Sequence, residues 1–252
     1  MRIALGVSND AGFIWPDKPL SDEGVQMHIE PGVVEGAKLA LSVITAAGAV
    51  AYAVKTTLGT VKDAGFTQLA ARSVITTLLV FCFFQVLPHY PVGVSEVHFI
   101  LGATLFLMFG AGAAAIGLAM GLLMQGLLFA PADLPQYGMN VTTLLVPLLL
   151  VDVLARRLIP AKTAYKDIKY KQALALSTAY QGGVVAWVAF WAFYGNGFGA
   201  ENIAQVSSFS AAYMIVIVVE PLLDMAILAM TKSLHQLRES KLFNSRLYHS
   251  AI

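Results

Sequence analysis

Cysteine and charge are both scarce in this sequence of 252 residues. The single cysteine, Cys82, cannot form a disulfide within the chain and excludes a cysteine metal cluster. Lysine, arginine, aspartate and glutamate together make up only 12% of the residues, and the net charge is +1. Such a balance provides no strongly basic surface, so we expect no nucleic-acid partner.

Two sequence signatures are also missing. No stretch resembles the glycine-rich phosphate loop that ends in Gly-Lys-Ser/Thr, so we expect no ATP hydrolysis by this chain. Residues 1–26 are polar and lack the apolar stretch of a secretory signal, so we expect the first span to direct membrane insertion.

Hydrophobic residues are abundant instead. They make up 58% of the chain, against roughly 45–50% in soluble domains, and the mean hydropathy is +0.71. A bilayer core needs roughly 20 apolar residues per helix. On that scale we predict an all-α polytopic membrane bundle of about seven transmembrane helices, at residues 33–54, 72–87, 97–109, 111–130, 140–159, 172–194 and 208–230. Residues 27–252 would form one transmembrane domain, preceded by a polar extension at 1–26.

The distribution of basic residues predicts the topology. Thirteen of the 16 lysines and arginines fall after the first, fifth and seventh predicted spans, and cytoplasmic loops are rich in such residues. The N-terminus is then outside and the C-terminus inside, which requires an odd number of spans. This favours a turn at Gly110–Gly112, where one bent helix is the alternative. The basic stretch 156–171 is a topology determinant, or a docking surface for another subunit or for anionic lipid.

Two histidines stand at the starts of predicted spans. His28 precedes the first and His98 stands at the boundary of the third, and the topology places both outside with His89, while His235 and His249 fall inside. An amide nitrogen and the imidazole of one histidine can chelate a divalent metal, and a second imidazole could complete the site. Nitrogen ligands in a plane favour Ni(II) or Cu(II). The alternatives are that His28 anchors a helix start and that His98 bonds a helix-end carbonyl.

Three segments resemble the CbiM/NikM family, the substrate-capture components of energy-coupling-factor transporters for cobalt and nickel. They are Met27-His28-Ile29-Glu30-Pro31-Gly32, the stretch from Gln85 through Pro91-Val92 to His98-Phe99-Ile100-Leu101-Gly102, and Gln125-Gly126-Leu127-Leu128-Phe129 leading to Gly138-Met139-Asn140. The resemblance covers most of residues 27–159 and weakens afterwards.

The resemblance implies a function and a ligand set. The chain would capture Co²⁺ or Ni²⁺ as its substrate, with no resident cofactor, through nitrogens of Met27, His28 and His98. Its partners would be a transmembrane coupling component, cytoplasmic ATPase subunits and a small accessory membrane subunit, in the bacterial inner membrane and in support of cobalamin biosynthesis. Because a ligating imidazole is usually hydrogen-bonded at its other nitrogen, we expect supporting roles for nearby polar residues: His89, Asn140, Gln85, Glu96 and Glu30.

One feature departs from the family pattern. The family's Met is the chain terminus, whereas Met27 here follows 26 residues. Either the working chain begins at Met27, or a protease exposes that nitrogen, or the site binds differently. We favour Met27 as the working N-terminus. The choice between cobalt and nickel stays open.

Two acids in the last predicted span, Glu220 and Asp224, are one helical turn apart. Ionisable groups inside a bilayer are costly and usually face the protein interior. They could line a transport path, or they could be buried and hydrogen-bonded without such a role. They also define a rival function, a secondary ion-coupled carrier. A haem-bearing redox subunit is remote, because it would need facing histidines within the spans, and every histidine here sits at a span boundary or in a tail.

Overall fold

The computed structural model describes residues 34, 36–161 and 163–237, with side chains as far as residue 233. These residues form seven α-helices, one β-hairpin and three 3₁₀ turns. The helices are α1 (Leu39–Ala64), α2 (Phe66–Gln85), α3 (Gly102–Phe109), α4 (Ala111–Leu128), α5 (Tyr137–Leu158), α6 (Tyr170–Asn196) and α7 (Ala200–Leu237). The hairpin joins β1 (Tyr90–Val92) to β2 (Ser95–Val97), and the 3₁₀ turns are η1 (Gly36–Lys38), η2 (Pro131–Gln136) and η3 (Tyr165–Asp167).

The all-α bundle and the number of helices confirm the prediction. Six helical segments are long and apolar enough to cross a membrane: Gly36–Ala64, Phe66–Gln85, Ala111–Leu128, Pro131–Leu158, Tyr170–Asn196 and Ala200–Ser233. The third predicted span, 97–109, is helical only from Gly102 to Phe109. Eight residues of α-helix extend about 12 Å, too short to cross a bilayer alone. The hairpin and the non-helical residues 98–101 precede this short helix.

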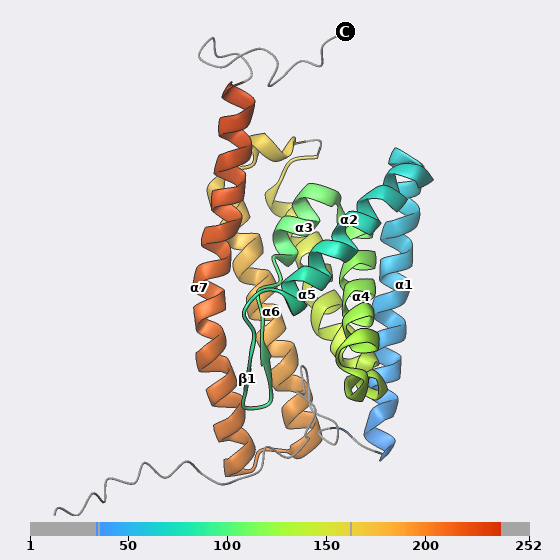
Figure 1. Ribbon diagram of the computed structural model, residues 1–252, viewed down its shortest axis with the longest axis vertical. Helices are drawn as coiled ribbons and strands as arrows, with labels where there is room; N and C mark the ends of the chain where they lie inside the picture. Colours follow the sequence, from blue (N-terminus) through green and yellow to red (C-terminus); the bar gives the residue numbers. More distant parts are fainter. Residues whose placement is uncertain (1–33, 35, 162, 238–252) are drawn as a thin grey trace, which may run out of the picture.

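The break between the third and fourth segments is a real turn. Gly110 has φ +86°, in the region that residues with a side chain rarely adopt, and it separates the end of α3 from the start of α4. This confirms the predicted turn over the single bent helix. The first residue of α1 and the last of α7 lie at opposite ends of the long axis (Figure 1), as an odd number of crossings requires.

Basic residues from separate elements meet at one end of the bundle. Lys55 of α1 and Arg156 of α5 line one cleft there, together with Asp63. Arg156 donates to Asp152, one turn earlier in α5, with Nη2 2.9 Å from Oδ2. This gathering agrees with the charge pattern of the sequence. Which side of the membrane this end faces remains a prediction.

Small residues of α4 allow neighbouring helices to approach closely. A Cβ on Gly121 would lie 2.6 Å from a Val80 methyl carbon in α2, and one on Gly112 would lie 2.9 Å from the Cα of Thr57 in α1. Such contacts are how helices associate in lipid. Gly48 in α1 behaves differently, because nothing lies within 4 Å of its Cβ position. Gly48 therefore does not mediate a close helix contact within the described residues.

Candidate metal centre

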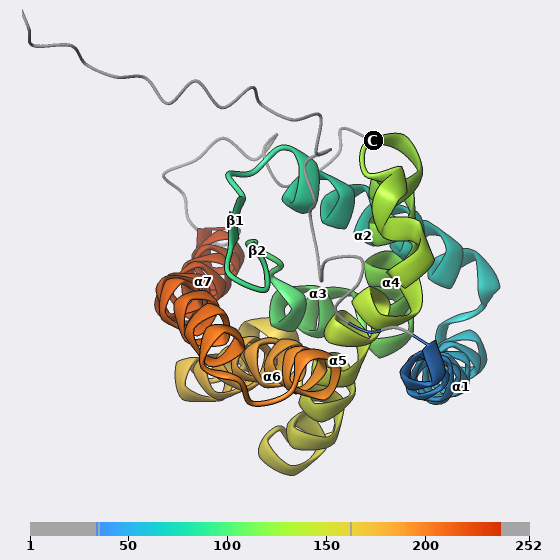
Figure 2. The same cartoon turned by 90° about the horizontal axis from the view of Figure 1, so that it is seen from below.

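The β-hairpin carries the central residues of the candidate site into the bundle. Seen along the long axis, it lies between α2 and α7 (Figure 2). Its strands pair antiparallel, with Pro91 opposite Glu96. Because side chains alternate along extended backbone, positions 96 and 98 can face the same way. Glu96 is 3% exposed and His98 is 5% exposed, so both polar side chains are buried.

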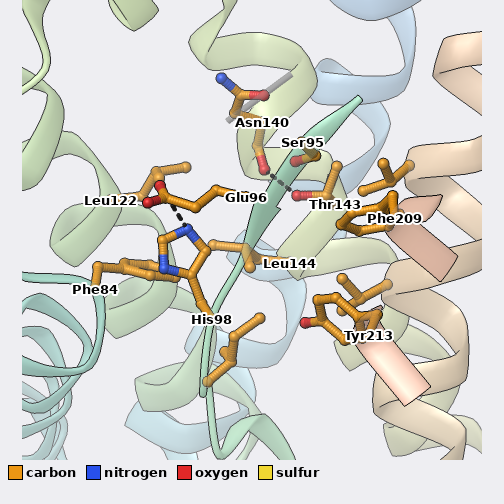
Figure 3. A pocket seen from close by; sticks show the side chains of 13 residues that line it. Phe84, Ser95, Glu96, His98, Leu122, Asn140, Thr143, Leu144, Phe209 and Tyr213 are labelled. Carbon is orange, nitrogen blue, oxygen red and sulfur yellow. Dashed lines mark hydrogen bonds and ion pairs between the residues drawn. The ribbon is translucent and has the colours of Figure 1, made fainter. Parts of the chain in front are cut away.

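These residues line a small cavity of about 30 Å³. That volume is suited to one ion or one water molecule rather than an organic solute. Its wall draws on α2, the hairpin, α4, α5, α6 and α7 (Figure 3). The lining residues are Phe84, Ser95, Glu96, His98, Ile100, Leu122, Asn140, Thr143, Leu144, Val184, Val188, Phe209 and Tyr213.

The ring of His98 is held on two sides. Its Nε2 lies 3.2 Å from Oε2 of Glu96, the interaction drawn as a dashed line in Figure 3. Its face meets the edge of a neighbouring ring, since the centroids of His98 and Phe84 are 4.9 Å apart at an interplanar angle of 77°. A carboxylate on one nitrogen and an aromatic wall fix both the tautomer and the orientation of a ligating imidazole.

Glu96 also reaches a second histidine. Nε2 of His89 lies 3.7 Å from its Oε1, and the rings of His89 and His98 are 5.7 Å apart. The structure therefore brings His89 to the carboxylate that supports His98.

Asn140 and Gln85 differ in their relation to the cavity. Asn140, at 3% exposure, lies in the cavity wall, and within the described residues neither end of its side-chain amide has a hydrogen-bond partner. An unsatisfied buried amide is costly, so a group entering this cavity would gain from it. Gln85 stands at the end of α2, outside the residues that line the cavity.

Met27, His28 and Glu30 lie outside the described residues. The nearest described residue, Val34, is 1% exposed and packs with Met139 and Trp191. Met139 precedes Asn140 of the cavity wall. His28 lies six positions before Val34, a reach of about 20 Å when the chain is extended. Among the described residues no group of three His, Cys, Asp or Glu side chains could hold a metal ion, so a site at His98 needs ligands from elsewhere in the chain.

Glu220 and Asp224 are buried on α7, at 0% and 2% exposure. Glu220 Oε2 accepts from the backbone N–H of Ile100 at 2.9 Å, and its Oε1 accepts from the Gln181 side chain. Asp224 accepts from the Thr104 hydroxyl. Neither Gln181 nor Thr104 was predicted as a site residue from the sequence. A polar side chain inside a predicted span is the signal that could have identified both.

The fold is that of a multi-pass membrane protein, and its small cavity is walled in part by an imidazole, a carboxylate and an amide. The family model for CbiM, the cobalt uptake substrate-specific transmembrane region, matches residues 28–237. The chain belongs to this family. Its members are membrane components of transporters and are not enzymes.

A solved structure supports the fold. The crystal structure of a transition metal transporter superposes with a TM-score of 0.63 and 18% sequence identity, over 88% of this chain and 98% of the other. At that identity the likeness concerns the fold alone. A comparison with curated proteins found no match.

Proposed function

We propose that this chain captures Ni²⁺ or Co²⁺ for uptake, as the substrate-specific component of an energy-coupling-factor transporter. The observation that carries the proposal is the buried imidazole of His98, which lines an ion-sized cavity with Nε2 beside the Glu96 carboxylate. Membership of a cobalt uptake family supports the class of substrate. ATP hydrolysis and the coupling to transport would come from separate subunits in the bacterial inner membrane.

The remaining ligands would come from the segment before Val34. In this proposal the Met27 amine, the His28 amide nitrogen and the His28 imidazole join His98 around the ion. The amine and amide close a five-membered chelate ring, and the amide and imidazole close a six-membered one. An imidazole held by a carboxylate at Nε2 would bind through Nδ1. Four nitrogens near one plane favour Ni²⁺, and Co²⁺ fits if the protein imposes this geometry.

Metal titration of the purified protein tests the proposal. His28→Ala and His98→Ala should each abolish tight binding of Ni²⁺ and Co²⁺, measured by equilibrium dialysis, while membrane insertion is unchanged. His235→Ala, near the end of α7, is the matched control and should bind as the unmodified protein does. Tight binding by both site variants would reject the ligand assignment.

A further inference from the structure

Helix α7 supports the hairpin at two points on either side of His98. At the hairpin tip, Gly93 has φ +61° and approaches the α7 backbone so closely that a Cβ would collide with the carbonyl oxygen of Gln205. After the hairpin, the Ile100 N–H donates to Glu220 Oε2 at 2.9 Å. Gln205 and Glu220 are about 22 Å apart along the helix. The hairpin runs beside α7 in Figures 1 and 2.

The turn between His98 and α3 has an unusual backbone. Leu101 has φ +52°, and it is the one described residue other than glycine with a positive φ. L-residues with a side chain avoid this region because Cβ crowds the following carbonyl. The next residue, Gly102, lies so close to the ring of Tyr180 in α6 that a Cβ would overlap it. Packing from α6 and bonding from α7 together hold this conformation.

The carboxylate of Glu220 connects this turn to the cavity wall. Its Oε1 accepts from Gln181 Nε2, and Gln181 Oε1 accepts from the Tyr213 hydroxyl at 3.1 Å. Tyr213 and Ile100 both line the cavity. One buried chain of hydrogen bonds therefore links the His98 turn, α6, α7 and two walls of the candidate site.

A second carboxylate repeats the attachment one turn further along. Asp224 accepts from the hydroxyl of Thr104 in α3, as Glu220 accepts from Ile100. The two donors, Ile100 and Thr104, are four residues apart, and so are the two carboxylates that accept from them. No lysine, arginine or histidine among the described residues forms an ion pair with either carboxylate. The bonding pattern fits an attachment of α3 to α7 better than a chain of open cation ligands, because both oxygens of Glu220 already accept hydrogen bonds.

We infer that Glu220 is a positioning residue for the metal centre: it fixes the turn after His98, and through that turn it sets the place of the imidazole. The inference rests on the proposed function, since it assumes that His98 binds the ion. It assigns Glu220 a role through hydrogen-bond geometry, in contrast to a role as a charged step in the transport path. These two roles predict opposite rankings of conservative variants.

Glu220→Gln and Glu220→Asp in the full chain separate the two roles. Gln keeps the length of the side chain: its oxygen can accept from Ile100, and its amide can donate to Gln181 once that amide rotates. Asp keeps the charge but is about 1.5 Å shorter, so it cannot reach Ile100 without movement. If Glu220 is a positioning residue, Ni²⁺ binding should weaken by about threefold or less in Glu220→Gln and by about tenfold or more in Glu220→Asp. A role of the charge predicts the reverse ranking.

The visible spectrum of bound Ni²⁺ gives a second measurement, because its bands depend on ligand geometry and not on overall stability. We expect a shifted spectrum for Glu220→Asp and an unchanged one for Glu220→Gln. Asp152→Asn is the matched control, since this buried carboxylate of α5 bonds Tyr52 and Arg156 and not the His98 turn. Two results would overturn the inference: weaker Ni²⁺ binding by Glu220→Gln than by Glu220→Asp, or unchanged Ni²⁺ affinity and spectrum in both variants.

The His98→Ala variant distinguishes a failure of the proposed metal centre from a failure of the positioning role of Glu220. If this variant still binds Ni²⁺ tightly, the proposed metal centre is wrong and the inference falls with it. If it loses binding while both Glu220 variants behave as the unmodified protein, only the positioning role is wrong.

Discussion

Glu96 Oε2 lies 3.2 Å from His98 Nε2, and the two residues are separated by a single position in the chain. Both side chains are buried among apolar helices: Glu96 lies on the hairpin and His98 directly after it. A carboxylate is rarely buried without a partner, and here the partners are two imidazoles. This geometry is the arrangement in which a carboxylate orients a ligating histidine and raises its basicity.

The first prediction concerns this carboxylate. Glu96→Gln should weaken Ni²⁺ binding by about 10-fold to 100-fold, because the amide can hold the His98 ring but has no negative charge to strengthen the ligand. Equilibrium dialysis with Ni²⁺ measures the effect. Asp167→Asn is a suitable control, since Asp167 forms an exposed ion pair with Lys166 far from the hairpin. Equal affinities for Glu96→Gln and the unmodified protein would contradict the role.

The second prediction concerns the nitrogen of Met27. A chain that begins at Met27 should bind Ni²⁺ at least about 100-fold more tightly than one that retains residues 1–26, because a terminal amine is a far better ligand than a peptide nitrogen with carbon on both sides. Dialysis of the two forms gives the comparison, and N-terminal sequencing of the native protein shows which form is made. Tight binding by a protein that verifiably begins at Met1 would reject Met27 as a ligand through its amine.

The third prediction concerns the tip of the hairpin. Gly93→Ala should destabilise the protein by about 1–3 kcal/mol and weaken metal binding, because alanine is strained at φ +61° and its Cβ would collide with Gln205. Thermal unfolding in detergent measures the first effect and dialysis the second. Gly48→Ala is the control: this glycine is helical with open space around it, so alanine should be neutral or slightly stabilising.

Some features of the fold were readable from the sequence because they depend on local rules. Apolar length gave the number of helices, and the glycine at 110 marked the turn between α3 and α4, since only local backbone conformation is involved. The limits of α7 were harder to predict. It extends from Ala200 to Leu237, beyond the predicted 208–230, because polar residues continue a helix past its apolar centre. Pro221 lies inside this continuous helix.

The short third helix could not be predicted from hydropathy. Apart from His98 and Thr104, residues 97–109 are apolar, and only the tertiary structure decides that 98–101 are not helical while 102–109 are. The bonds that hold this segment, from Ile100 to Glu220 and from Thr104 to Asp224, join residues 120 positions apart. The two acids were recognised as unusual, but their partners lie on an element whose shape no local pattern reveals.

The last prediction separates the proposed function from a secondary carrier. The purified chain alone in liposomes should bind Ni²⁺ but should not accumulate it under a proton gradient, and accumulation should require coupling and ATPase subunits. The physical reason lies in the buried acids: Glu220 is bonded through both oxygens within the described structure, and a proton-coupled carrier needs a carboxylate that exchanges its proton with an ion or with water. Uptake of ⁶³Ni²⁺ into liposomes measures this, with His98→Ala as the control for leakage. Proton-driven accumulation that Glu220→Gln abolishes would favour the carrier, because that variant removes the titrating group and keeps the hydrogen bond to Ile100.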